Sequence, residues 1–217
     1  MAKVLREPFS AISHLIGTGL AIFALVLMIL RADQFGNVWH TVSFSIFGAS
    51  LILLYLFSTL YHLLPLSPDW VQFFKRLDHM MIFVLIAGSY TPYCLIPLRG
   101  AWGWTLLALI WSLAISGIIL KLFWLYTPRW LTVGMYLFMG WLSIVAIYPV
   151  IITVPRGGLM WLSAAGLIYT FGAVIYAFKW PDPFPQFFGF HEVWHLFIMA
   201  ASFCHFWSVY QYLSFLP

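Results

Sequence analysis

The sequence of 217 residues contains little charge, since Lys, Arg, Asp and Glu together make up only 7%. A soluble domain carries roughly 25% of such residues, so this composition excludes an ordinary water-soluble protein. Hydrophobic residues make up 64% of the chain, and the mean hydropathy is +0.97. We therefore expect an integral membrane protein. A spanning helix needs about 20 apolar residues, so residues 1–217 leave room for about seven helices in one domain and for no separate soluble domain.

Cysteine and clustered positive charge are also scarce. The two cysteines, Cys94 and Cys204, fall in apolar segments, where a free thiol usually acts as a small buried hydrophobe. No disulfide framework is expected. The formal net charge of +4 is spread over the predicted loops instead of forming a basic stripe. This pattern argues against nucleic-acid binding and for contact with membrane lipids as the partners of the chain.

Seven apolar segments predict an all-α bundle of seven transmembrane helices. We place them at about His14–Leu30, Thr41–Leu64, Arg76–Pro97, Trp102–Phe123, Trp130–Ile152, Leu159–Phe178 and His191–Phe215. Residues from Met1 to about Ser13 are predicted to form a short polar lead. A charged lead before an apolar run also describes a signal peptide, but the run is long and Arg31-Ala32-Asp33 offers no small-residue cleavage site. We therefore expect a retained first helix.

Lysine and arginine placement predicts the orientation of this bundle. Seven basic residues lie at the N-terminus and in the second, fourth and sixth loops: Lys3, Arg6, Lys75, Arg76, Lys121, Arg129 and Lys179. Three lie on the opposite side: Arg31, Arg99 and Arg156. Because cytoplasmic loops carry an excess of Lys and Arg, this distribution favours a cytoplasmic N-terminus. An odd number of helices then puts the C-terminus outside.

The segment His191-Glu192-Val193-Trp194-His195 begins the last apolar run. Two histidines four residues apart lie on one face of a helix and can bind a single metal ion together. Such a short pattern also arises by chance. It reads literally as the HExxH signature of zinc proteases, in which Glu192 would be the general base, and this alternative is the less favoured one.

The predicted topology brings further polar side chains to the same membrane depth. The second helix ends at His62, the third begins with Asp78, and the seventh begins with His191 and His195, all on one side. Ionisable groups inside a bilayer are expensive and usually face a bundle interior or a cavity. The sequence therefore predicts a functional site here. Taken singly, each residue could instead have an interfacial or helix-pairing role.

The remaining histidines differ in their predicted distance from this site. His14 and His79 lie on the same side and are candidates for contact with the metal ligands. His205 follows His195 by ten residues, roughly 15 Å along a helix axis, and cannot join the same metal. His40 lies at the opposite interface and is predicted to be solvated.

Several motifs follow one another along nearly the whole chain. They are Glu7, Ser10 and Ser13-His14-x-x-Gly17; Ser58-x-x-x-His62; Arg76-Leu77-Asp78-His79 followed by Gly88-Ser89-Tyr90-Thr91-Pro92; and His191-x-x-x-His195 followed by Cys204-His205-Phe206. In this order they resemble the hemolysin III branch of the progestin and adipoQ receptor family. A serine stands at Ser10, where asparagine is more usual in that family.

The resemblance implies seven transmembrane helices with a cytoplasmic N-terminus, in agreement with the count of basic residues. It also implies a zinc ion held by His62, His191 and His195, with Asp78 and Ser58 near its water. The compact chain, without the extensions of eukaryotic members, is similar to the bacterial members, which implies a location in the bacterial inner (plasma) membrane.

The chemistry of this residue set is compatible with hydrolysis. Three imidazoles and one open position are typical of catalytic zinc, which lowers the pKa of its water to about 7 and polarises a carbonyl. Asp78 would accept or orient the proton of the water, and Ser58 would donate a hydrogen bond to a developing oxyanion. The alternative for Ser58 is a hydrogen bond to a backbone carbonyl one turn earlier, as is common in membrane helices.

Two classes of function therefore remain open. Eukaryotic relatives are associated with ceramidase activity, which favours a zinc-dependent hydrolase of lipid amide or ester bonds acting in membrane lipid homeostasis. The alternative is a non-catalytic, receptor-like or homeostatic membrane protein with structural zinc. Lytic activity, which gave the family its name, is less favoured because no long amphipathic segment is present and the spans are too apolar to line a wide channel.

Overall fold

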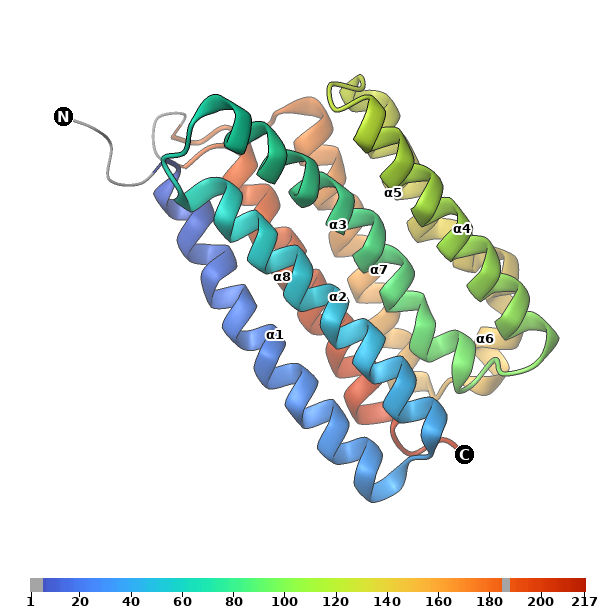
Figure 1. Cartoon of the computed structure of the whole chain (residues 1–217). Coiled ribbons are helices and arrows are strands. Elements are labelled where there is room, and N and C mark those ends of the chain that lie inside the picture. The colour runs from blue at the N-terminus through green and yellow to red at the C-terminus, as the bar shows by residue number, and fades with distance from the viewer. Residues whose placement is uncertain (1–5, 185–187) are drawn as a thin grey trace.

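The computed structural model describes residues 6–184 and 188–217, and these residues form a bundle of helices without a β-strand (Figure 1). An isolated bridge pairs Phe184 with Phe188. The α-helices are α1 (Pro8–Phe35), α2 (Val38–Leu63), α3 (Pro68–Leu95), α4 (Ala101–Phe123), α5 (Arg129–Trp141), α6 (Ile147–Thr153), α7 (Arg156–Phe178) and α8 (Phe190–Ser208). A 3₁₀ segment, η1 (Leu142–Ala146), joins α5 to α6, and a π-helical turn, η2 (Val209–Leu213), continues α8.

The first four helices run alternately in opposite directions, with α2 packed between α1 and α3, and α4 beyond α3. The last helix, α8, lies against α7 and also packs against α1, so the first and last helices of the chain are neighbours in the bundle (Figure 1). As a result, α1, α3 and α8 begin at the end of the bundle where α2 finishes. We call this end the N-terminal end.

Within residues 6–184 and 188–217, six helical segments are long and apolar enough to cross a membrane, which agrees with an all-helical membrane protein. They are Pro8–Phe35, Val38–Leu63, Ala101–Phe123, Arg129–Thr153, Arg156–Phe178 and Phe190–Leu213. The 28-residue α3 is long enough, but its first half carries Asp69, Lys75, Arg76 and Asp78. A seventh span formed by α3, and the orientation of the bundle, therefore stay predictions.

Two helices begin earlier than hydropathy indicates. The first begins at Pro8 and not at His14, so the predicted polar lead is wrong for its last residues. The third begins at Pro68, eight residues before the predicted start at Arg76. Proline is favoured in the first turn because its fixed φ suits the helix. The N–H that proline lacks would have no intrahelical acceptor at that position. Hydropathy detects the apolar part of a helix and misses such polar first turns.

The predicted fifth span, Trp130–Ile152, is interrupted in the structure. The hydroxyl of Tyr90, on α3, lies 2.7 and 2.8 Å from two carbonyl oxygens in the last turn of α5, and it accepts a hydrogen bond from the backbone N–H of Ser143 at 2.9 Å. A side chain that enters the helical hydrogen-bond ladder in this way breaks the regular helix. The chain therefore passes through η1 before α6 begins.

Small residues allow close approach of the helices around the interior. A Cβ atom on Gly88 of α3 would come within 2.3 Å of Ser50 Oγ on α2, and one on Gly172 of α7 within 2.7 Å of Phe197 Cβ on α8. Interfaces between membrane helices commonly use small residues for this purpose. Cys94 and Cys204 are both buried and free, which confirms the expectation that they form no disulfide.

Candidate metal centre

Three histidines from two helices meet at the N-terminal end of the bundle. His62 is in the last turn of α2, while His191 and His195 are in the first two turns of α8. The Nε2 atom of His191 lies 3.4 Å from Nε2 of His62 and 3.2 Å from Nε2 of His195. One ligand atom from each residue lies within 4.8 Å of the others. Two nitrogens bound to one tetrahedral zinc are roughly 3.4 Å apart, so the donor set fits such an ion.

The second nitrogen of His62 is also held. Its Nδ1–H donates to Oε2 of Glu7 at 2.5 Å, and the backbone N–H of Glu7 donates to the carbonyl oxygen of His62 at 3.0 Å. This contact selects the tautomer that presents the Nε2 lone pair to the other two imidazoles. A histidine that binds a metal usually donates its other N–H to a carboxylate or carbonyl in this way.

The charge of Glu7 is stabilised by its neighbours. Burial alone would raise its pKa, but the hydrogen bonds and positive charge of His62 and Arg6 outweigh burial and lower the pKa of Glu7 to about 2. The Arg6 guanidinium lies 3.2 Å from Oε1 of Glu7 and stacks on the ring of Tyr61, with its Cζ atom 4.2 Å from the centroid. Glu7 is therefore a carboxylate at neutral pH.

His14 lies against one of the candidate ligands. Its ring stacks on that of His195 with the centroids 3.8 Å apart and an angle of 15° between the planes. His14 is buried, and neither of its ring nitrogens has a hydrogen-bond partner within the described part of the chain. This stacking contact from α1 restricts the orientation of the His195 ring.

Glu192, between the two histidines of α8, is engaged elsewhere. Its Oε2 accepts the backbone N–H of Gly189 at 2.9 Å, which caps α8, and its Oε1 accepts the hydroxyl of Ser10 at 2.9 Å. Glu192 is absent from the described residues that line the adjoining cavity. Both carboxylate oxygens are thus used to join α1 to the start of α8. This geometry argues against the HExxH interpretation, in which the glutamate must face the metal.

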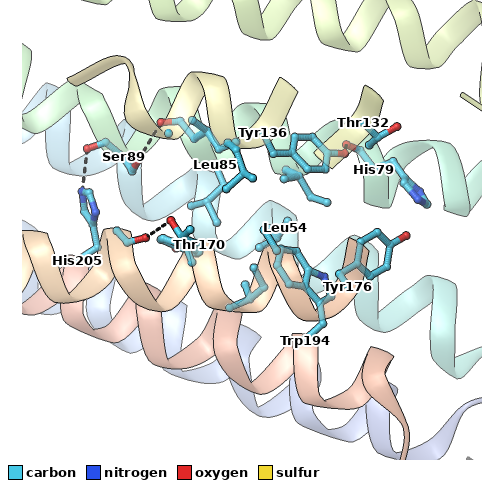
Figure 2. Close-up of a pocket in the computed structure, with 18 of the residues that line it drawn as sticks. Leu54, His79, Leu85, Ser89, Thr132, Tyr136, Thr170, Tyr176, Trp194 and His205 are labelled. Carbon is cyan, nitrogen blue, oxygen red and sulfur yellow. Dashed lines mark hydrogen bonds between the residues drawn. The ribbon is translucent and has the colours of Figure 1, made fainter. Parts of the chain in front are cut away.

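A cavity of about 860 Å³ opens beside the three histidines and extends between the helices. Its walls are mostly aliphatic and aromatic, and include Leu54, Leu85, Ile86, Tyr136, Leu162 and Trp194. Figure 2 shows His79 and Thr132 at one end of the view and Ser89 and His205 at the other. This volume falls in the range of ligand-binding sites.

The structure brings the two predicted catalytic residues to the same cavity as His62, His191 and His195. The Asp78 side chain is 14% exposed, and its carboxylate lies 3.8 Å from Nδ1 of His79. Asp78 is outside the group of three side chains that could hold a metal together.

Ser58 is buried one turn before His62 on α2 and lines the cavity. The hydroxyl of its neighbour Thr59 donates to the carbonyl oxygen of Tyr55 at 2.7 Å, as is common in membrane helices. The Ser58 hydroxyl makes no such bond to any residue that the structure describes. It is therefore available to a ligand in the cavity.

The other histidines lie outside the cluster. The Nε2–H of His205 donates to the carbonyl oxygen of Ser89 at 3.0 Å, and the Nδ1–H of His79 donates to the carbonyl oxygen of Lys75 at 2.7 Å. The prediction that His40 is solvated is wrong, because His40 is buried and its Nε2–H donates to the carbonyl oxygen of Leu213 at 3.2 Å. The other ring nitrogen of His40 accepts the backbone N–H of Asn37 in the N-terminal capping box of α2, and this contact orients the ring toward Leu213.

The contact of Glu7 with His62 was not predicted from the sequence, in which Glu7 is part of the family motif but has no assigned role. The available signal was its position directly before Pro8, at the predicted membrane side that also holds His62. A second such residue is Lys121, which the sequence predicts in a loop and which lines the cavity in the structure.

Comparison with known proteins adds information on ancestry. The sequence model of a family described as haemolysin-III related matches residues 2–206. The chain is 43% identical to Hemolysin-3 of Bacillus cereus over 213 residues, covering 97% of this chain and 93% of the relative. It is 40% identical to the Hemolysin-3 homolog of Bacillus subtilis (strain 168) over 217 residues, covering 100% and 99%. It is also 29% identical to the human Monocyte to macrophage differentiation factor over 187 residues, covering 82% and 73%.

Proposed function

Because the chain belongs to the haemolysin-III related family, we propose that it is a zinc-dependent hydrolase of lipid amide or ester bonds, embedded in the bacterial inner membrane with its N-terminal end in the cytoplasm. One observation carries this proposal. Three imidazole nitrogens meet at the end of a largely apolar cavity that Asp78 and Ser58 also line.

Zinc would be held by Nε2 of His62, His191 and His195, a donor set that suits this ion. Bound there, zinc supplies Lewis-acid chemistry, polarising a carbonyl and lowering the pKa of water in its open position to about 7. The carboxylate of Glu7 keeps His62 in the tautomer that this binding requires.

The side chains of this protein would divide the remaining work. The carboxylate of Asp78 accepts the proton of the attacking water and can return it to the leaving amine or alcohol. The free hydroxyl of Ser58 donates a hydrogen bond to the oxygen on which negative charge develops. The apolar walls, such as Leu54 and Leu85, receive an acyl chain and keep bulk water from the reacting bond.

A second candidate function is a non-catalytic membrane protein with structural zinc. The observation that favours it is that the three ligands connect α2 to α8, so a bound ion would join distant parts of the sequence. Nothing in the apolar walls of the bundle favours lysis, although two of the relatives carry the name Hemolysin-3.

A lipid assay distinguishes these functions. Purified protein is incubated with a mixed membrane-lipid extract, free fatty acid is measured by mass spectrometry, and zinc is measured by elemental analysis. We expect about one zinc per chain and zinc-dependent release of fatty acid. His191→Ala and His195→Ala should lose most of the zinc and the turnover, whereas His205→Gln, which removes an imidazole from the same cavity outside the cluster, should retain the zinc.

Two results would count against the proposal. Stoichiometric zinc in both His191→Ala and His195→Ala would show that the ligand assignment is wrong. Full zinc occupancy without turnover of any amide or ester lipid would favour the structural role.

A further inference from the structure

Lys121, in the last turn of α4, carries a buried positive charge without a negative partner. Its side chain is 2% exposed, and no carboxylate of the described residues pairs with it. The ammonium donates to the hydroxyls of Thr127 and Thr132, the second at 2.9 Å, and these two hydroxyl oxygens lie 2.8 Å apart. Two of its three donors are thus used. A buried charge without a counter-ion is costly, and such a group commonly marks a ligand site.

Two further cations line the cavity with Lys121. Lys75 of α3 has its Nζ 5.1 Å from the ring centroid of Tyr126, and Arg129 of α5 has its Cζ 5.0 Å from the ring centroid of Tyr176. None of the three forms an ion pair with a carboxylate within the described residues. We call Lys75, Lys121 and Arg129 the basic wall of the cavity.

Two carboxylates line the same cavity, and neither neutralises the basic wall. The carboxylate of Glu7 is paired with His62 and Arg6. Asp78 lies beside His79, outside ion-pair distance of Lys121. The basic wall therefore has an excess of positive charge, and within it Lys121 is buried while Lys75 and Arg129 are partly exposed.

The basic wall is connected to the candidate metal centre through α3. Thr132, which binds Lys121, is one turn before Tyr136, whose hydroxyl donates to the carbonyl oxygen of His79 at 3.1 Å. His79 follows Asp78, and Figure 2 shows His79 and Thr132 at the same end of the cavity. One amphiphilic molecule can therefore face the basic wall and the residues around Asp78 while its chain follows the apolar interior.

We propose that the basic wall binds the phosphate group of an anionic phospholipid whose acyl chain occupies the apolar part of the cavity. The ammonium of Lys121, the hydroxyls beside it and the guanidinium of Arg129 match the oxygens of a phosphate. The apolar remainder of the cavity favours a phosphate that carries a hydrocarbon chain over a free one. The inference rests on the proposed function for the choice of this cavity as the substrate site, while binding itself requires no metal.

Lipid binding tests this proposal without reference to turnover. Native mass spectrometry of the protein in a neutral detergent compares phosphatidylglycerol with phosphatidylcholine of the same acyl chains, before and after removal of metal with a chelator. We expect phosphatidylglycerol to bind about tenfold more tightly in both states, since the quaternary ammonium of phosphatidylcholine puts a positive charge beside its phosphate, and the basic wall repels that charge. Inorganic phosphate at the same concentration should compete weakly.

Lys121→Gln removes the charge and keeps a donor for Thr127 and Thr132. This variant should lose most of the preference for the anionic lipid and keep its zinc content. Lys179→Gln, at the exposed end of α7 and outside the cavity, is the matched control and should keep the preference. If Lys121→Gln does not fold, Lys75→Gln takes its place, with a smaller expected loss of about threefold because that side chain is partly exposed.

The outcomes separate this inference from the proposed function. Equal binding of the two lipids by the wild type, or an unchanged preference in the folded Lys121 or Lys75 variant, would overturn it. Competition by inorganic phosphate as strong as that by the lipid would assign the wall to a soluble anion and would also overturn it. A retained anionic preference in a protein without hydrolytic turnover supports the lipid site and rejects only the enzymatic function.

Discussion

His62 is held on both nitrogens of its imidazole ring. Nε2 faces His191 and His195, and Nδ1–H donates to the carboxylate of Glu7. Because the carboxylate is negatively charged, it favours binding of a cation at Nε2. A residue just before the first helix can thereby adjust a site whose other two ligands are on the last helix.

Replacing Glu7 by Gln should weaken metal binding about tenfold, at the lower end of the effect of such outer partners, because the amide oxygen still accepts the hydrogen bond but carries no charge. Competition of the protein with a chelator of known affinity measures this change. Asp33→Asn removes an exposed carboxylate from the other end of α1 and is the control. Equal affinities for Glu7→Gln and the wild type would contradict the role of Glu7.

Asp78→Asn should retain zinc and thermal stability while turnover falls by roughly two to four orders of magnitude, the usual contribution of acid–base catalysis. The physical reason is that Asp78 is outside the candidate metal-holding group and, in the proposed mechanism, contributes only a proton-accepting charge. Zinc content, melting temperature and turnover are measured on this one variant. Retained zinc with unchanged turnover would exclude the catalytic role, whereas a joint loss of zinc and stability would favour a structural one.

At this scale, some contacts could be predicted from sequence and others could not. The pairing of His191 with His195 follows from helical periodicity alone. The contact of Glu7 with His62 joins residues 55 positions apart, and it depends on how α1 enters the bundle. Burial of His40 was missed for the same reason, because its partner Leu213 is 173 positions away.

Among the elements, the interruption between α5 and α6 depends on a side chain from another helix. The break leaves backbone groups of the fifth span without their helical hydrogen-bond partners in an apolar setting. The hydroxyl of Tyr90 bonds to these groups instead. Hydropathy predicts the length of this span correctly to within a few residues, from Trp130–Ile152 to the observed Arg129–Thr153. It carries no information on the break, whose cause lies on α3.

Tyr90→Phe should lower the free energy of unfolding by about 1–3 kcal/mol, because buried carbonyl and N–H groups near Ser143 lose their partner. The melting temperature of the protein in detergent should fall by several degrees. Tyr148→Phe is the matched control, because the Tyr148 side chain is 72% exposed and should change nothing measurable. An unchanged melting temperature for Tyr90→Phe would show that water or a local shift compensates the loss.

For the whole molecule, the candidate metal centre connects helices that are far apart in sequence. His62 is in the last turn of α2, while His191 and His195 are in the first two turns of α8, and α1 packs against both helices. An ion bound there would resist separation of these helices. The composition predicted the all-helical membrane architecture, but such closure of the bundle depends on tertiary packing that hydropathy does not describe.

Removal of zinc should therefore lower the melting temperature. A ligand that binds only the folded state stabilises it by about 2.7 kcal/mol at a free concentration of 100 times Kd, and the shift grows with concentration. Melting curves at a series of buffered zinc concentrations measure the effect. His195→Ala should show almost no dependence on zinc, and a shift as large as that of the wild type would mean that the ion binds elsewhere.

The positions of the three histidines also bear on how the protein is made. His62 precedes His191 by 129 residues, so five α-helices of the bundle are synthesised between the first ligand and the second. A nascent chain that has inserted α1 and α2 offers an incoming ion only one of the three candidate ligands, His62. The site is completed after α8 has entered the membrane and packed against α1. Under the proposed function, metal loading follows the insertion of α8, and cells starved of the ion should accumulate inserted, full-length apoprotein.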